Sequence, residues 1–369
     1  MIDKKKLNLL LLAVCKPEAI GGQAACARML LNHFGEVNWR WISFPLPKQY
    51  SSFLRTIYSL KILFQALWIC ITKKTDVVHI LTACGRAALF EKLIIARILK
   101  FTGVKTVINF QGAFDNYYSG FSVRDRQRIK NLLSKVDVVL CLHSDIEKFL
   151  VREKIVTAEK ISVIPNAVEV EQLPERIPDP DGKFRLLYLG WLVKNKGLFT
   201  LVEAVGILRK KYREEKFILD ITGPEMEEGI ISALKKEAGK NDAQSFISFN
   251  VPVFGEEKRR LFASTDLFVF PTRMEGFPFV LLEAMESGLS VVTTNISPMN
   301  LVVHDEINGT LFQKDNAEDL AVKIEKLMHD ASLRKKLGKN ARQHVIKHFS
   351  VAKIISEYRM LYEKLEEEY

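Results

Sequence analysis

The chain has 369 residues, of which 48% are hydrophobic and 27% are charged. This length favours two domains of about 150–200 residues each, and the composition excludes a disordered chain, a collagen-like repeat and a disulfide-rich miniprotein. The net charge of +10 lies entirely in the first half: residues 1–172 carry 25 Lys+Arg and 14 Asp+Glu, a net +11, whereas residues 173–369 carry 29 and 30, a net −1.

The first half alternates short apolar runs with amphipathic stretches of helical period. Such alternation predicts a parallel sheet with helices on both faces. The predicted strands are residues 7–14, 37–44, 76–81, 104–110, 137–142 and 160–164, and the predicted helices are 23–34, 52–72, 86–101, 122–135 and 145–153.

A linker is expected where Pro174, Pro178, Pro180 and Gly182 fall within nine residues. The alternation then restarts, which predicts a second doubly wound domain. Ligands of such sheets bind at the carboxyl ends of the strands, so the expected site is a cleft between the domains. The predicted strands are 184–189, 217–222, 245–250, 267–270 and 290–293, and the helices are 197–211, 227–238, 256–263, 279–287, 316–330, 332–347 and 351–367.

Neither cysteines nor apolar runs point to export or to a membrane span. The five cysteines, which form no C-x-x-C pair, are expected to be small buried side chains in a reducing cytosol. Residues 7–14 are too short for a signal sequence and lead into a Pro and Gly-Gly loop. Residues 53–71 are apolar but include Arg55, Lys61 and Gln65, so no transmembrane segment is expected.

The run from Pro271 to Gly288 carries most of the chemical information. Glu275 follows a predicted buried strand, and Glu283 lies inside the next predicted helix. The start of that helix would offer free N–H groups and a positive dipole end, which favour a phosphate. Two carboxylates on either side of it suit a nucleotide sugar, with one accepting from sugar hydroxyls and the other from the ribose diol. The alternative is an unrelated surface Glu and helix Glu.

The run from Glu275 to Gly288, continuing through Val291-Val292 to Asn308-Gly309, resembles the retaining family-4 glycosyltransferases of the GT-B fold. Further matching stretches, in the family's order, are Gly21-Gly22-Gln23, Asp137-Val138-Val139 with Ser144, residues 164–169, residues 189–197, Thr222-Gly223-Pro224, Val253-Phe254-Gly255 and Pro271. The resemblance implies an α/β fold of two Rossmann-like, doubly wound domains with an interdomain cleft. Its domains would be an acceptor-binding domain at 1–172, a nucleotide-sugar domain at 173–350 and a helix at 351–369 that returns to the first domain.

The same resemblance assigns roles to single residues. Glu275 and Lys196 are the expected catalytic residues, with Lys196 meeting the donor diphosphate as a point charge. Gln111 and Asn166 are expected on the acceptor side. The expected donor-binding residues are Glu283, Gly276, Phe277, Pro278, Gly223, Trp191 and Gly22. The alternatives are a solvated lysine for Lys196 and plain turns for Gly22 and Asn166.

Three positions depart from the family pattern. Trp191 stands where the family usually has an Arg that forks onto diphosphate oxygens; Trp either stacks or packs, and Lys194 is a candidate substitute charge. Gln111 stands where the family often has His, and it can form hydrogen bonds but cannot titrate. Asn300-Leu301 replaces a Pro-Glu pair. These departures bear on catalytic strength more than on the fold.

No other catalytic motif competes. There is no H-E-x-x-H, Cys/His zinc spacing, Walker motif or G-x-G-x-x-G, and His79 and His304 are expected to be structural. Asp179-Pro180-Asp181 lies in the linker and is interpreted as a solvated turn. No cofactor or metal is therefore expected beside a UDP- or GDP-sugar donor, and cationic groups and helix ends would stabilise the leaving diphosphate.

The resulting hypothesis is transfer of a hexose-type sugar to a hydroxyl of a lipid-linked acceptor or growing surface glycan. The resemblance to the family implies that the anomeric configuration is retained. The alternatives are a sugar-nucleotide epimerase or phosphorylase on the same fold, or a catalytically weak scaffold. The basic, apolar helices of the first domain predict a cytoplasmic protein peripheral to an anionic membrane; solvated faces of ordinary helices are the other interpretation. Nucleic acid is not an expected partner, because no stacking platform accompanies the basic residues.

Overall fold

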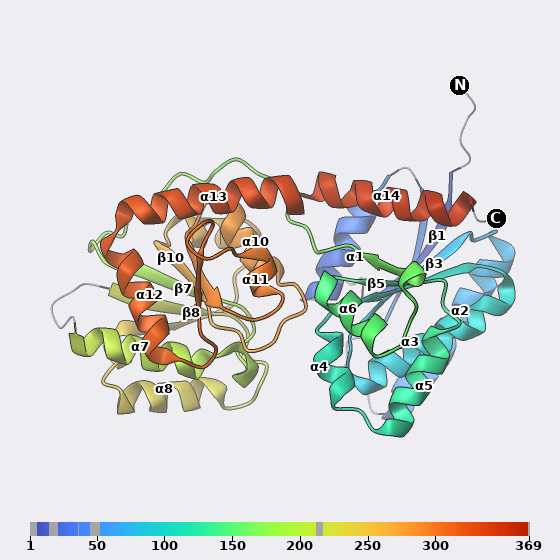
Figure 1. The fold of residues 1–369 in the computed structure, drawn as a ribbon, viewed down its shortest axis with the longest axis horizontal. Helices are drawn as coiled ribbons and strands as arrows, with labels where there is room; N and C mark the ends of the chain where they lie inside the picture. Colours follow the sequence, from blue (N-terminus) through green and yellow to red (C-terminus); the bar gives the residue numbers. More distant parts are fainter. Residues whose placement is uncertain (1–5, 15–20, 36, 45–51, 212–216, 368–369) are drawn as a thin grey trace. The chain divides into compact units, whose positions relative to one another are not determined.

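The computed structural model describes residues 6–14, 21–35, 37–44, 52–211 and 217–367. For residues 52 and 53 it describes the backbone alone. The chain divides into two compact units (Figure 1). The first unit comprises the residues up to Ala167 together with those from Val351 onward, and the second comprises Val168–Ser350. The boundary thus lies five residues before the expected one, because Val168 and Glu171 already bond to the second unit through Phe349 and Glu286.

The first unit is a six-stranded parallel sheet in the order β2-β1-β3-β4-β5-β6. Its strands β3 and β5 are buried along their whole length, and β1 and β4 are buried after their first residue, as expected for apolar runs covered by helices on both faces. Its strands are β1 (Asn8–Ala13), β2 (Asn38–Ser43), β3 (Val77–Thr82), β4 (Lys105–Phe110), β5 (Val138–Cys141) and β6 (Ile161–Val163). Its helices are α1 (Gly22–His33), α2 (Ser52–Thr72), α3 (Arg86–Leu99), η1 (Lys100–Thr102), α4 (Phe114–Ser119), α5 (Val123–Leu133), α6 (Ser144–Arg152) and η2 (Ala158–Lys160).

The second unit repeats the plan, with a parallel sheet in the order β12-β11-β10-β7-β8-β9. Its strands are β7 (Phe184–Leu189), β8 (Phe217–Thr222), β9 (Ile247–Asn250), β10 (Leu267–Phe270), β11 (Val291–Thr294) and β12 (Thr310–Phe312). Its helices are η3 (Lys194–Lys196), α7 (Leu198–Lys211), α8 (Ile230–Lys240), η4 (Gln244–Phe246), α9 (Gly255–Ala263), α10 (Phe279–Glu286), α11 (Met299–Val302), α12 (Ala317–His329) and α13 (Ala331–Phe349). The short α4, α11 and β12 were not predicted, because each is too short to show a period.

The last helix, α14 (Val351–Glu367), packs into the first unit beside α1 (Figure 1). Its buried stripe includes Tyr358 and Tyr362, whose hydroxyls find partners in the core. The Tyr362 hydroxyl lies 2.5 Å from Nδ1 of His79, and the Tyr358 hydroxyl accepts from Nδ2 of Asn109 at 3.1 Å. Polar contacts to the central strands β3 and β4 thus accompany apolar burial in fixing α14 to this sheet.

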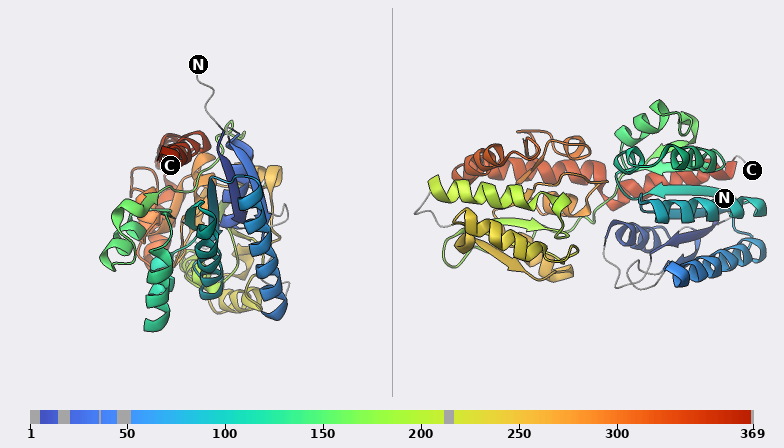
Figure 2. Two further views of the ribbon diagram at one scale, coloured as in Figure 1. Left: turned by 90° about the vertical axis from the view of Figure 1, so that its right-hand side faces the viewer. Right: turned by 90° about the horizontal axis from the view of Figure 1, so that it is seen from below.

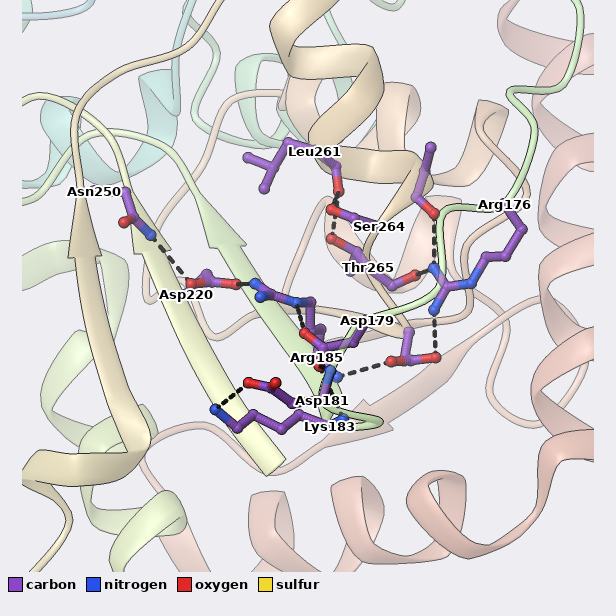
Figure 3. Close-up of polar contacts among 12 residues, drawn as sticks. Arg176, Asp179, Asp181, Lys183, Arg185, Asp220, Asn250, Leu261, Ser264 and Thr265 are labelled. Atoms are coloured by element: carbon purple, nitrogen blue, oxygen red, sulfur yellow. Dashed lines mark hydrogen bonds and ion pairs between the residues drawn. The ribbon is translucent and has the colours of Figure 1, made fainter. Parts of the chain in front are cut away.

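The expected linker is tied to the second unit rather than loose (Figure 3). Arg185 donates to Asp179 at 2.6 Å and to Asp220 at 2.8 Å, while Arg176 donates to Asp266 at 2.5 Å. The backbone N–H groups of Asp181 and Lys183 also donate to Asp179. The prediction of a solvated turn was wrong for Asp179, whose side chain is 4% exposed, since Arg185 compensates its charge.

The helix α2 meets the length and composition of a membrane span, which the sequence analysis did not expect. It is the one helix in the described part of the chain that is long and apolar enough to cross a membrane, judged by length and composition alone. Arg55 and Lys61 are too few to disqualify it, contrary to the expectation from the sequence. Only 17% of its most apolar window is buried.

Protonation of His79 should weaken the first unit. Burial lowers the pKa of His79 from 6.5 to about 3, so below pH 6.5 the unfolded chain binds a proton that the folded chain does not. The free energy of unfolding should therefore fall by about 2 kcal/mol between pH of about 7 and about 5. Urea unfolding over this range should show a shallower pH dependence for His79→Gln; an unchanged slope would contradict this prediction.

Candidate functional site

The carboxyl ends of β7, β8 and β10 meet at one edge of the second sheet, where two glycines permit close backbone contact. Gly197 has φ +68°, and a Cβ there would lie 1.9 Å from the carbonyl oxygen of Pro271. Gly223 has φ +150°, and a Cβ there would lie 1.8 Å from the carbonyl oxygen of Gly190. Only glycine fits at either position. The loops after three strands are thereby held against one another.

This close packing brings Lys196 to Glu275. Lys196 ends η3 after β7, and Glu275 lies on the loop between β10 and α10, yet the Lys196 ammonium donates to Oε1 of Glu275. Both side chains are mostly buried, at 17% and 14% exposure. The backbone N–H of Arg273 donates to Asn195 at 2.9 Å, which joins the same two loops. Two predicted residues that are 79 positions apart therefore form one ion pair.

The start of α10 lies next along the chain. Its first turn has Pro278 at the N-cap position and no side-chain hydrogen bond to the cap. Helix N-termini of this kind attract anions through their free N–H groups and dipole. Glu283 lies in α10, but its Oε1 accepts from Nζ of Lys258 at 2.6 Å. The sequence analysis missed Lys258, because a single lysine in the amphipathic α9 carries no signal of its own.

Of the other predicted donor-side residues, Trp191 is 40% exposed. Its carbonyl accepts from the hydroxyl of Tyr188 at 2.8 Å; burial first, and then the charge of Glu275, raise the pKa of Tyr188 well above its usual range. Trp191 is therefore partly exposed, and Tyr188 holds its backbone. Lys194, the candidate substitute charge, pairs with Glu227 at 3.3 Å instead.

Gly276, Phe277 and Pro278 connect Glu275 to α10. Phe277 is buried, and its ring centroid lies 5.4 Å from that of Phe349 at the end of α13. This contact makes Phe277 a packing residue that fixes the loop on which Glu275 sits. Its predicted donor-binding role remains a prediction.

In the first unit, Gln111 follows β4 at the carboxyl edge of the sheet. Its Nε2 donates to Asn109 at 3.0 Å, and Asn109 in turn donates to Tyr358 of α14. Among the described residues, none lies within hydrogen-bond reach of the buried Oε1 of Gln111. The C-terminal helix therefore orients Gln111 through Asn109, and one amide acceptor is left over.

The sequence analysis missed His143, which follows β5 at the same edge. The side chain is 5% exposed, and its Nδ1 has no hydrogen-bond partner in the described part of the chain. Burial lowers the pKa of His143, while the charges of Asp115 and Asp145 oppose that shift. The edge thus carries an imidazole although Gln111 stands where the resembled family has its histidine. The only available signal was the position of His143 directly after an apolar run.

The remaining predicted residues of the first unit are Gly22 and Asn166. Gly22 is the first residue of α1, and Gly21 before it has φ 122°, so this pair does begin a helix. Asn166 is buried near the end of the unit. Their predicted roles remain predictions.

The described residues contain no group of three or more His, Cys, Asp and Glu side chains that could hold a metal ion. Among the described residues, Cys26, Cys70, Cys84 and Cys141 are buried thiols that are part of no disulfide. Cys15 lies outside the described residues.

The part of the chain that builds the Lys196–Glu275 edge has a recognisable sequence. Residues 169–344 match the family described as "Glycosyl transferases group 1". The second unit therefore carries the domain of this glycosyltransferase group. The chain is 27% identical to an uncharacterized glycosyltransferase, MJ1069, of Methanocaldococcus jannaschii, over 70% of this chain and 66% of that protein. The chain is 24% identical to the UDP-Gal:alpha-D-GlcNAc-diphosphoundecaprenol alpha-1,3-galactosyltransferase of Escherichia coli, over 79% of this chain and 76% of that protein.

Solved structures show the same fold at low identity. Sucrose-phosphate synthase from Thermosynechococcus elongatus superposes with a TM-score of 0.81 and 18% identity, covering 99% of this chain and 100% of that chain. Anabaena HepE in complex with UDP and glucose superposes with a TM-score of 0.76 and 16% identity, covering 97% and 100%. The glycosyltransferase therefore has the expected GT-B fold of two doubly wound units.

The close approach at Gly197 can be tested against a matched glycine. Gly229 also has a positive φ, +77°, but a Cβ there would meet nothing within 4 Å. Gly229→Ala should cost about 1 kcal/mol of unfolding free energy for the left-handed backbone alone. Gly197→Ala should cost at least about 2 kcal/mol more, because its Cβ collides with Pro271. Equal losses for the two variants, measured by chemical denaturation, would contradict the account of this edge.

Proposed function

We propose that this glycosyltransferase moves a hexose-type sugar, with retention of anomeric configuration, from a UDP- or GDP-sugar to a hydroxyl acceptor. The second unit binds the donor and the first binds the acceptor. The observation that carries the proposal is the Lys196–Glu275 pair beside the uncapped start of α10. A compact cation, a carboxylate and free N–H groups match a diphosphate joined to a hydroxyl-rich sugar.

In the absence of donor, Lys196 and Glu275 satisfy each other. On donor binding, the Lys196 ammonium turns to the diphosphate, and Glu275 is released to accept hydrogen bonds from sugar hydroxyls. Glu283 exchanges Lys258 for the ribose diol in the same way. Since Glu275 pairs with Lys196 and Glu283 pairs with Lys258, none of these four charges is left uncompensated before the donor arrives.

The transfer step needs no external oxidant or base. The acceptor oxygen attacks the anomeric carbon on the face from which the diphosphate departs, and the bond from that carbon to the phosphate oxygen breaks. The departing phosphate oxygen takes the proton of the acceptor hydroxyl. Lys196 and the start of α10 stabilise the charge that develops on the leaving group.

The acceptor is proposed to be lipid-linked or a growing surface glycan. The relative from Escherichia coli is named for a galactosyl transfer to a diphosphoundecaprenol-linked sugar. The net +11 of residues 1–172 supports an anionic acceptor. The four described cysteines, which are buried thiols outside any disulfide, support a reducing cytoplasm as the place of action.

The decisive experiment is a donor screen that measures released nucleotide, with lipid-linked and soluble sugar acceptors side by side. Release that depends on acceptor, together with a product of the donor's anomeric configuration by NMR, is the expected result. Inverted product would refute retention. Failure of every nucleoside diphosphate and nucleotide sugar to bind by calorimetry would refute the proposed function.

Two lysines of the same short helix give a matched test of the diphosphate contact. Lys196→Gln removes the buried cation and should weaken nucleoside diphosphate binding by about tenfold or more, as expected for a lost charge-assisted contact. Lys194→Gln removes an exposed lysine that pairs with Glu227 and should change affinity less than about threefold. Calorimetry that finds both variants equally weakened would assign the effect to general charge rather than to Lys196.

Loss of Glu275 should separate binding from turnover. Glu275→Gln keeps the size of the side chain, so nucleoside diphosphate affinity should stay within about threefold of the original. The turnover number should fall by about a hundredfold or more, because the sugar loses a charged acceptor that positions it for attack. Steady-state kinetics with a donor identified by the screen measures both. A variant that keeps full turnover would remove Glu275 from the catalytic residues.

A further inference from the structure

The helix α2 exposes a continuous apolar face. The spacing of three or four residues between successive members places them on one side of the helix. Their exposed fractions lie between 44% and 69%, which is unusual for side chains of this size. The members of this α2 face are Leu54, Ile57, Leu60, Phe64, Trp68 and Ile71.

The opposite side of α2 is anchored in the first unit. Ile62, Ala66 and Cys70 are buried in the core. Ser59 donates to Glu91 of α3, and Arg55 lies 3.5 Å from the same carboxylate. Figure 2 shows α2, drawn in blue after β2, at the margin of the first unit in both views.

The surroundings of the α2 face are basic. Residues 37–75 contain six Lys and Arg and no Asp or Glu. Lys61 lies within α2 and Lys73 and Lys74 follow its end, all three exposed. Two acidic groups from neighbouring elements, Glu91 and Asp76, are turned inward onto Lys92 and Asn8. The α2 face therefore combines apolar side chains with Lys61, Lys73 and Lys74, none of which forms an ion pair within the described residues.

A neighbouring short helix adds to this surface. The helix η1 contacts α2, and its Thr102 lies beside the Cys70 thiol near the end of α2. Phe101 of η1 is 85% exposed. A large aromatic side chain is thus presented to solvent next to the end that carries Trp68 and Ile71.

The topology opposes a transmembrane role for α2. The helix connects β2 to β3, and both strands pair with β1 in one parallel sheet. Its two ends are therefore held at opposite ends of the same sheet, and a span would carry the sheet and the Arg55–Glu91 contact into the hydrocarbon. A helix with one apolar face and flanking lysines is suited to lie in the plane of the interface instead.

We infer that the α2 face docks on an anionic lipid bilayer, with Phe64 and Trp68 inserted among the acyl chains and Lys61, Lys73 and Lys74 among the headgroups. The apolar side chains supply affinity and the all-basic segment selects negative lipid. A second copy of the chain is a poorer occupant, because two copies of this basic face would repel. The inference concerns where the enzyme works and stands independently of its donor and acceptor.

The test is cosedimentation of the full chain with vesicles of phosphatidylcholine alone or mixed equally with phosphatidylglycerol. Binding is expected to the mixed vesicles and to weaken with salt. Phe64→Gln with Trp68→Gln should lower the partition coefficient on the order of a hundredfold. Ile307→Gln with Val322→Gln is the matched control, since these two side chains are 61% and 58% exposed in the second unit. It should bind as the original does.

Three results would overturn the inference: no binding of the original chain to mixed vesicles, undiminished binding of the α2 double variant, or self-association that the α2 variant abolishes. Both variants should keep the original's thermal unfolding and nucleoside diphosphate affinity, which removes misfolding as an explanation. Vesicle binding without any nucleotide binding would refute the proposed function and leave docking intact. Nucleotide binding without vesicle binding would refute docking and leave the proposed function intact.

Discussion

The close approach of three loops at the carboxyl edge of the second sheet is the constraint on which the candidate site depends. Gly197 against Pro271 and Gly223 against Gly190 leave no room for a Cβ. Because the loops after β7 and β10 touch there, Lys196 reaches Glu275 and two opposite charges share a largely buried place. Burial of a single charge at this position would be costly, so the pair is what makes the site stable without a ligand. A donor can replace both partners of this ion pair. Its negative diphosphate oxygens can accept from Lys196, and its sugar hydroxyls can donate to Glu275.

Much of this fold could be predicted from the sequence. Alternating apolar runs and helical periods gave two parallel sheets, and long elements such as α2 and α14 appeared within one or two residues of their predicted ends. Short elements such as α4 and β12 show no period and could not be found. At the site, the positions of Glu275, Glu283 and Lys196 could be predicted, whereas the ion pairs of the two carboxylates with Lys196 and Lys258 could not. An ion pair between Lys196 and Glu275 depends on the separation of two loops, which no local pattern encodes.

The first unit shows how distant residues set a local environment. Tyr358 of α14 holds Asn109, and Asn109 holds Gln111, so the orientation of an amide at the edge of the sheet depends on the far end of the chain. His143 was invisible in the sequence because a histidine after an apolar run is usually a core residue. The structure instead leaves its Nδ1 and the Gln111 carbonyl, within the described residues, without hydrogen-bond partners. The exposed face of α2 was equally hidden, since the sequence shows that the helix is apolar but not which side packs inward.

The central claim is that Lys196 and Glu275 exchange each other for the donor. A crystal structure of the full chain with a nucleoside diphosphate sugar tests it most directly. The account predicts that Nζ of Lys196 lies within hydrogen-bond distance of a diphosphate oxygen, and that Glu275 accepts from hydroxyls of the sugar. A bound donor beside an intact Lys196–Glu275 pair, or at another part of the second unit, would contradict the account.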